Sequence, residues 1–143
     1  MPQLPLPTKK VLTLDAAKQI AAAAHEEARK NNWTMAISIV DDGAHLLYLE
    51  RMDGTQIASV IVAQDKAATA VRFKRPTKAL EEAVAGGRFV VMKLAGVTPI
   101  EGGLPIVVEG EVIGGIGVSG APGADKDEAC ANAGLAKIGD RLN

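Results

Sequence analysis

Two segments of this sequence have the pattern of a β-strand, a tight turn and a second β-strand, and they restrict the fold more than any other feature. The first covers residues 34–40 and 45–51 around the turn Asp41–Ala44. The second covers residues 104–109 and 111–118 around Gly110. Branched apolar residues flank turn-forming residues in both segments, which is typical of β-hairpins. Because hairpin strands are antiparallel, we predict an antiparallel sheet.

The segments around these hairpins have helical periodicity. Thr13 is predicted to cap a helix that ends near residues 31–32 and whose apolar face is formed by Leu14, Ala17, Ile20, Ala21, Ala24 and Ala28. A second helix is predicted over residues 56–73, with an apolar face of Ile57, Val60, Ile61, Ala67, Ala68 and Val71. Short helices are predicted over residues 77–85, capped by Thr77, and 89–94, and a terminal helix over residues 125–141. The predicted fold class is α+β, a single domain whose central antiparallel sheet is built from hairpins with helices packed on it.

The domain organisation follows from length and from the proline content of the start of the chain. With 143 residues the chain has the size of one domain, predicted over residues 13–143. Residues 1–12 are predicted to form an extended arm, since three prolines among the first ten residues prevent a regular helix or internal strand. Both long helices carry alanine where leucine is usual, so less surface is buried within one chain. We therefore expect a homo-oligomer larger than a dimer.

Composition excludes several classes of function. The formal charge of -1 and the 3% aromatic residues give no basic patch or stacking platform for nucleic acid. No apolar stretch is long enough to cross a membrane, and no export signal is predicted, so a cytoplasmic location is expected. Cys130 is the single cysteine, which excludes an internal disulfide. It is interpreted as a small buried apolar residue.

Residues Gly115–Gly120 spell G-x-G-x-x-G after a predicted strand, the pattern of a dinucleotide-binding loop. That loop must open a strand–helix–strand unit with a parallel second strand. Here Pro122 and Gly123 precede the last helix, after which the chain ends. No nicotinamide or flavin cofactor is therefore expected, and the glycines are interpreted as sites where the strand bends or where a backbone or ligand approaches closely.

Three polar clusters are candidates for a ligand site. Arg51, Asp53 and Gly54 follow the first hairpin, Lys66 lies within the second helix, and Glu101, Gly102 and Gly103 precede the second hairpin. Where loops converge, a cation, carboxylates and exposed glycine backbone can form a pocket for an anion or a carbonyl group. Such a site places the functional groups within about 10 Å of one another, before salt screens their interaction. Equally, Arg51–Asp53 and Lys66–Glu101 are interpretable as structural ion pairs.

Two histidines, His25 and His45, are candidate ligands for haem iron. His45 is the first choice because it enters a strand directly from a turn and can face a pocket between subunits. His25 lies at the edge of the first helix's apolar face. Met52, Tyr48 and Cys130 are further candidates. Neither histidine belongs to an H-E-x-x-H pattern, so zinc hydrolysis has no support.

An ordered set of motifs resembles the signatures of the GlcG/HbpS family: residues 40–47, Arg51–Gly54, Asp65–Ala67 with Thr69–Ala70, Arg75–Thr77, Glu101–Val107, Gly110–Val112, Gly117–Gly120 and Asp127–Glu128. The resemblance extends from about residue 12 to about residue 140. The family is also similar to the carboxy-terminal module of PduO-type proteins. The resemblance implies a central antiparallel sheet flanked by helices, homo-oligomeric assembly, and binding of haem or a corrinoid-related ligand in some members. Other members are found with genes for glycolate, diol or aromatic catabolism.

Two main hypotheses follow. In the first, a small oligomeric protein binds haem or a compact carboxylated metabolite near Arg51, Lys66 and Glu101, as an accessory to a catabolic pathway. In the alternative, an enzyme of the isomerase, tautomerase or lyase type transfers a proton on a small oxygenated carboxylic acid. Arg51 then holds the carboxylate, and Lys66 or Glu101 is the acid or base. This alternative predicts that Lys66→Met loses activity with little loss of stability. A third possibility is a structural accessory protein.

Overall fold

The structure is a computed structural model that describes residues 1–142 of the chain. Its helices are α1 (Leu14–Lys30), α2 (Ala58–Phe73), α3 (Thr77–Ala85) and α4 (Ala124–Ile138), with short 3-10 helices η1 (Phe89–Lys93) and η2 (Gly139–Arg141). Its strands are β1 (Ala36–Asp41), β2 (Leu46–Arg51), β3 (Gly103–Val108) and β4 (Glu111–Ser119). The predicted helices and strands are present with ends shifted by a few residues, and the short helix after Arg88 is of the 3-10 type.

The four strands form one antiparallel sheet in the order β2-β1-β4-β3. Each hairpin supplies two neighbouring strands, and the two hairpins join through β1 and β4, where Ala36 lies opposite Ser119. The β3–β4 turn consists of Glu109 and Gly110, both with positive φ (51° and 79°), as a two-residue hairpin turn requires. The predicted α+β fold with an antiparallel sheet built from hairpins is confirmed.

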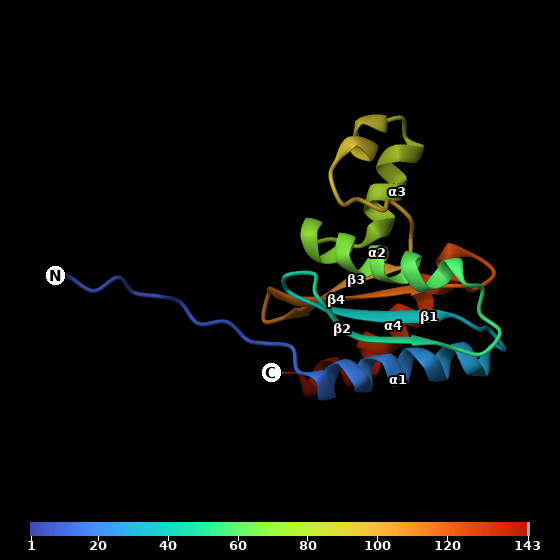
Figure 1. Cartoon of the computed structure of the whole chain (residues 1–143), viewed down its shortest axis with the longest axis horizontal. Coiled ribbons are helices and arrows are strands. Elements are labelled where there is room, and N and C mark those ends of the chain that lie inside the picture. Colours follow the sequence, from blue (N-terminus) through green and yellow to red (C-terminus); the bar gives the residue numbers. More distant parts are fainter. Residues whose placement is uncertain (143) are drawn as a thin grey trace.

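Helices cover both faces of the sheet (Figure 1). Helix α2 lies on one face, and α1 and α4 lie side by side on the other. Helix α3 and η1 rise from the α2 side as a projecting unit, and the arm formed by residues 1–10 leaves the body at one end of the sheet. Before Leu12 every residue of the chain is exposed. The projecting unit of α3 and η1 thus extends from one face of the sheet, and the exposed arm extends from one end of it.

Helix α1 begins and packs as its sequence predicts. Thr13 Oγ1 accepts a hydrogen bond from the Ala16 amide at 3.1 Å, so the predicted cap is confirmed. Of the predicted apolar face, all members are buried except Leu14, which is 48% exposed. This face packs on the core that β1 and β4 supply through residues such as Ile37, Ile39, Ile116 and Val118.

The predicted apolar face of α2 is partly wrong. Ile57 and Ile61 are 80% and 63% exposed, whereas Ala67, Ala68 and Val71 are buried as predicted. The other buried residues of α2 are small or polar: Ser59, Ala63, Lys66, Thr69 and Ala70. The reason lies in the opposing strands, whose Gly103, Gly115 and Gly117 have no side chain. A Cβ atom at any of them would collide with a main-chain carbonyl oxygen of α2. The backbone of α2 therefore lies directly on the sheet, which confirms close backbone approach as the role of glycines in the Gly115–Gly120 motif.

The start of α3 differs from the prediction as well. Its N-cap is Pro76, without a side-chain capping bond, so the predicted capping role of Thr77 is wrong. The Thr77 hydroxyl instead accepts a hydrogen bond from the Gly103 amide at 2.9 Å and ties α3 to the start of β3. Across residues 1–142, the structure contains no helix with the length and apolar character that crossing a membrane would require.

Candidate functional site

Lys66 is the centre of the candidate site and is almost completely buried. It lies in the middle of α2 with a relative exposure of 2%. Its Nζ donates hydrogen bonds to the Val118 carbonyl oxygen at 3.0 Å and to Asp127 Oδ2 at 3.2 Å. A buried ammonium group needs such partners because leaving water is costly for a charge. Lys66 therefore links α2 to the end of β4 and to the first turns of α4.

Asp127 completes this buried ion pair from the other side. Its relative exposure is 4%, and its Oδ1 accepts the Ala121 amide at 2.9 Å, which orders the loop between β4 and α4. Burial raises the pKa of Asp127 above its usual value, although Lys66 and the Ala121 amide oppose this shift. The pair thus joins three elements and one loop at a single buried point.

The segment Glu101–Gly103 closes over the ammonium group. Gly102 has φ of 129°, and a Cβ atom there would lie 2.8 Å from Lys66 Nζ and 2.8 Å from the Val118 carbonyl oxygen. The Gly102 carbonyl oxygen accepts the Val118 amide at 3.0 Å, and Gly103 is bound by Thr77. Only glycine fits at residue 102, and Lys66 is sealed beneath it. Lys66 is therefore screened from any ligand in this conformation.

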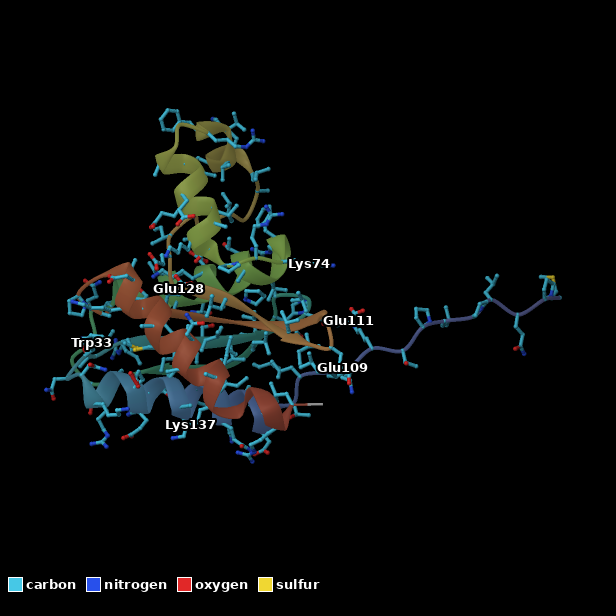
Figure 2. The ribbon with its side chains drawn as sticks, turned by 180° about the vertical axis from the view of Figure 1, so that it is seen from behind. Trp33, Lys74, Glu109, Glu111, Glu128 and Lys137 are labelled. Carbon is cyan, nitrogen blue, oxygen red and sulfur yellow. The ribbon has the colours of Figure 1, made fainter. Side chains whose placement is uncertain are left out.

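Glu101 lies beside the buried pair and contacts other charged groups. It is half-buried, its Oε2 lies 3.9 Å from Lys78 Nζ, and its amide donates to Glu81 Oε1 at 3.3 Å. Burial, together with a hydrogen bond and repulsion from Glu101, raises the pKa of Glu128 to about 7. Figure 2 shows Glu128 at the end of α4 that approaches α3. Glu101 and Glu128 form a carboxyl pair in which Glu128 takes up and releases a proton near neutral pH, as acid–base chemistry requires.

This carboxyl pair makes stability depend on pH. Because the pKa of Glu128 is raised in the folded state, the proton favours folding; its stabilisation is complete below about pH 4.5 and is lost as the pH rises through about 7. A pKa shift from 4.5 to about 7 corresponds to roughly 3 kcal/mol, and partial exposure of Glu128 to solvent reduces this value. We therefore expect the free energy of unfolding to fall by about 1–2 kcal/mol between about pH 5 and pH 8. Urea unfolding at both pH values measures this change. Glu128→Gln should flatten the dependence of stability on pH, and an unchanged slope would contradict the raised pKa of Glu128.

Arg51 and Asp53 lie apart from these groups. Arg51 ends β2 opposite Ala36, and both residues are exposed. Glu101 precedes β3, at the other edge of the four-stranded sheet, so the two backbones are separated by three strand spacings, or roughly 14 Å. The structure brings Lys66, Glu101, Gly102 and Gly103 together and leaves the first cluster on its own edge.

The ion pairs considered from the sequence have different partners. Within residues 1–142, Lys66 pairs with Asp127 and Glu101 with Lys78, whereas Arg51 and Asp53 form no ion pair with each other. Asp127, Glu128 and Lys78 were missed as site residues from the sequence. The available signal was the Asp127–Glu128 motif, which contributed to the family resemblance without being assigned a role.

The two histidines have different surroundings. His25 Nδ1 lies 2.7 Å from Glu50 Oε2, and the Tyr48 hydroxyl donates to Glu50 Oε1 at 3.3 Å. His45 lies on the β1–β2 turn with 83% of its side chain exposed and its Nδ1 3.4 Å from Asp41 Oδ1. A carboxylate on Nδ1 fixes the imidazole and leaves Nε2 free to bind a metal, as in many metal sites of proteins. His25 has the shorter contact and the more enclosed setting of the two.

The remaining candidate iron ligands are less accessible. Cys130 is completely buried, and burial raises the pKa of its thiol to about 12, as expected of a structural cysteine. Met52 packs against the core, and Tyr48 is held by Glu50. Among the side chains that the structure describes, no group of three or more histidine, cysteine or acidic residues has the geometry of a metal site.

Comparison with known proteins places this geometry in a family. Residues 12–136 match the family described as "Haem degrading protein HbpS-like". The chain is 46% identical over 112 residues to Protein GlcG of Escherichia coli (strain K12), covering 78% of this chain and 84% of GlcG. The chain belongs to the HbpS-like family. The resemblance to the GlcG/HbpS signatures is thereby confirmed.

Two solved structures of HbpS-like proteins share the fold. The crystal structure of HbpS matches with a TM-score of 0.86 and 36% identity, covering 93% of this chain and 94% of that chain. The crystal structure of a PduOC:Heme complex matches with a TM-score of 0.81 and 28% identity, covering 90% of this chain and 96% of that chain. The first relative belongs to a family named for haem degradation, and the second holds haem.

Proposed function

We propose that this HbpS-like protein binds haem or a closely related small ligand, as a homo-oligomer larger than a dimer and as an accessory to a catabolic pathway. The observation that carries the proposal is the likeness, over nine-tenths of the chain, to a PduOC protein in complex with haem. Membership of the HbpS-like family supports the same class of ligand.

The surface of the projecting unit is suited to such a ligand. On η1, Phe89, Val90 and Met92 are between 62% and 68% exposed, and the cationic residues Arg88 and Lys93 flank them. A haem group has apolar faces and two anionic propionates, so it is stabilised by apolar side chains next to cations. Exposed apolar surface of this kind often marks an interaction site. Met92 also offers a thioether, which sequence reasoning did not consider as an iron ligand.

A second copy is needed to bring this surface to His25. η1 lies on the α2 side of the sheet, whereas His25 belongs to α1 on the opposite side (Figure 1). One chain therefore presents its apolar-cationic surface and its fixed imidazole on different faces. In the proposed assembly, two copies contribute one each. This is the physical reason for linking ligand binding to oligomerisation.

Haemin titration tests the proposal. Added haemin should give a shifted Soret band, and His25→Ala should weaken binding at least tenfold because its imidazole is fixed by Glu50 for ligation through Nε2. His45→Ala is the matched comparison, since its imidazole is exposed. Light scattering and circular dichroism on the same samples report assembly and folding. If only His45→Ala loses haemin binding, His45 rather than His25 is the iron ligand. If the spectra of both variants are unchanged, neither histidine is the iron ligand.

The carboxyl pair favours one second candidate, proton transfer on a small oxygenated carboxylic acid. Burial next to Glu101 raises the pKa of Glu128 to about 7, so Glu128 can act as a general acid or base near neutral pH. Lys66 is sealed beneath Gly102, so Glu101 is the better acid–base candidate of the two considered from the sequence. Wild-type protein that gave no spectral response to haemin would overturn haem binding and favour this candidate.

A further inference from the structure

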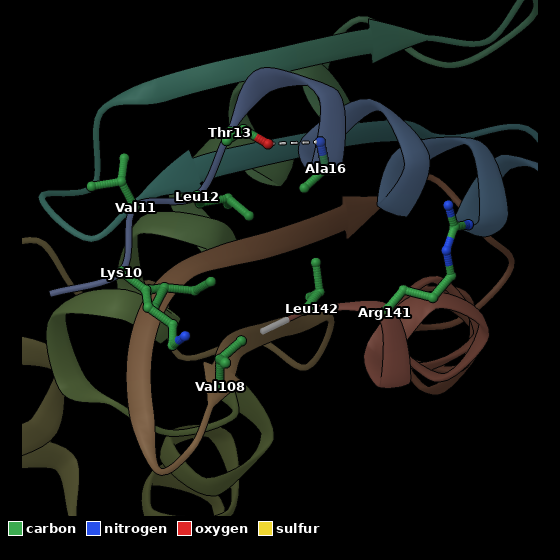
Figure 3. A pocket seen from close by; sticks show the side chains of 9 residues that line it. Lys10, Val11, Leu12, Thr13, Ala16, Val108, Arg141 and Leu142 are labelled. Carbon is green, nitrogen blue, oxygen red and sulfur yellow. Dashed lines mark hydrogen bonds between the residues drawn. The ribbon is translucent and has the colours of Figure 1, made fainter.

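An apolar groove lies between β3 and the carboxy-terminal part of α4. It encloses about 340 Å³ and is lined chiefly by Pro105, Val107, Leu135, Ala136 and Leu142. Val107 is 51% exposed although it belongs to a strand. A neighbouring cavity of about 210 Å³ at the base of the arm shares Leu142 with the groove (Figure 3). The groove is thus open, apolar and close to where the arm joins the body.

The arm carries apolar side chains that are exposed to solvent. Leu4 and Leu6 are 85% and 87% exposed. In an extended backbone these two side chains lie on the same side, because successive side chains alternate. The prolines at residues 2, 5 and 7 remove three amide donors and restrict the backbone before any contact forms. Docking the arm in an apolar groove therefore costs little in unsatisfied donors or chain entropy.

The arm is directed away from its own groove. Pro7–Lys10 line a cavity together with Val108, Glu109 and Glu111 of the β3–β4 turn, and Lys9 Nζ lies 2.7 Å from Asp42 Oδ2. Beyond this point the chain continues outward from the body (Figures 1 and 2). A return to its own groove would require a reversal within the segment that Pro5 and Pro7 hold extended.

We infer that the arm of one copy docks in the groove of a second copy, in a two-fold pair that exchanges arms. The arm and the groove lie at the same end of the molecule, since Leu142 lines both the groove and the cavity at the base of the arm. A two-fold axis at that end places each arm over the other groove. Six extended residues reach about 20 Å, enough to pass from one body to the next.

Charge and edge chemistry agree with this occupant. Residues 1–8 of the arm carry no charged side chain, and the residues that line the groove carry none either. The Gly103 amide donates to Thr77 and therefore points to the outer edge of β3, away from β4. Pro105 is two residues further along the strand, so its nitrogen points to the same edge and has no hydrogen to donate. The edge is thus unsuited to an added strand. The arm binds through the side chains of Leu4 and Leu6.

Crosslinking between differently tagged chains tests the inference, in a Cys130→Ala background that removes the native thiol. A tagged Leu6→Cys chain is mixed with an untagged Val107→Cys chain and treated with a short bis-maleimide. We expect a mixed crosslinked dimer in at least tenfold higher yield than with Asp125→Cys, an exposed position in the first turn of α4. Adding Leu4→Asp to the arm chain should reduce the yield about tenfold, because a carboxylate enters an apolar groove. The result is independent of haem and of the titration above.

Two results would overturn the inference. One is a yield with Val107→Cys no higher than with the Asp125→Cys control. The other is a single chain carrying both Leu6→Cys and Val107→Cys that crosslinks mainly within itself when dilute, since the arm would then occupy its own groove. Circular dichroism of each variant confirms that the fold is retained.

Discussion

Lys66→Met should lower the free energy of unfolding by about 3–5 kcal/mol, because it leaves the buried Asp127 carboxylate without its cation. Methionine matches the length of lysine, so the lost interaction rather than a cavity dominates the change. Urea unfolding followed by circular dichroism measures it. Lys18→Met, on the exposed side of α1, is the matched control and should change stability by less than about 0.5 kcal/mol.

A second substitution identifies the cause. Asp127→Asn in the Lys66→Met background removes the stranded charge while its amide oxygen can still accept the Ala121 amide. It should restore at least about 1 kcal/mol. A loss below about 1 kcal/mol in Lys66→Met, or no recovery in the double variant, would show that the buried pair does not support the fold.

This expectation reverses the one drawn from the sequence. As a catalytic group, Lys66 was predicted to be replaceable with little loss of stability. The structure gives it 2% exposure and a buried partner, so a loss of activity in Lys66→Met would mainly report unfolding. The carboxyl pair of Glu101 and Glu128, rather than Lys66, is the place to test acid–base chemistry.

The second large effect concerns the contact between α2 and the sheet. Gly117→Ala should lower the free energy of unfolding by about 3 kcal/mol or more, because its Cβ would overlap the Ala63 carbonyl oxygen and the Ala67 amide nitrogen. Backbone atoms cannot move aside as a flexible side chain can. The helix must therefore shift away from β4. Thermal and urea unfolding measure the change.

Gly139→Ala is the matched control for this substitution. A Cβ atom at Gly139 meets nothing within 4 Å, and its φ of -53° suits any residue. Alanine there should be neutral or slightly stabilising, since it favours helical backbone. Equal effects of the two substitutions would show that α2 does not depend on glycine for its position.

The sequence predicted the fold well because the hairpins and α1 are local patterns. Turn residues specify the hairpins and a capping threonine specifies the start of α1, and each of these signals lies within a few residues of the element it specifies. The orientation of α2 was not predictable in the same way, because it depends on glycines in β3 and β4, some forty or more residues away. Ile61 then lies on the outer face of α2, 63% exposed, against the usual rule that large apolar residues turn inward.

The candidate site was predictable in part for the same reason. Glu101, Gly102 and Gly103 are consecutive, and the structure places Lys66 directly beneath them. Asp127 and Glu128 reach Lys66 and Glu101 because α4 packs on the sheet, and sequence periodicity does not predict where that helix packs. Arg51 and Asp53 were grouped with these residues although the strand order, which no local pattern reveals, puts them on the other edge of the sheet.

The pairing of β1 with β4 also determines how the chain must fold. Each hairpin forms through contacts between residues close in sequence. Asp41 of β1 and Gly114 of β4, in contrast, are separated by more than 70 residues. Contacts of such sequence separation slow folding, because the chain loses entropy before they form. We therefore expect the pairing of the two hairpins to be the slow step of folding. During synthesis, the apolar faces of the first hairpin and of α1 are expected to stay uncovered until β4 has left the ribosome, and this is when the nascent chain most needs protection from aggregation.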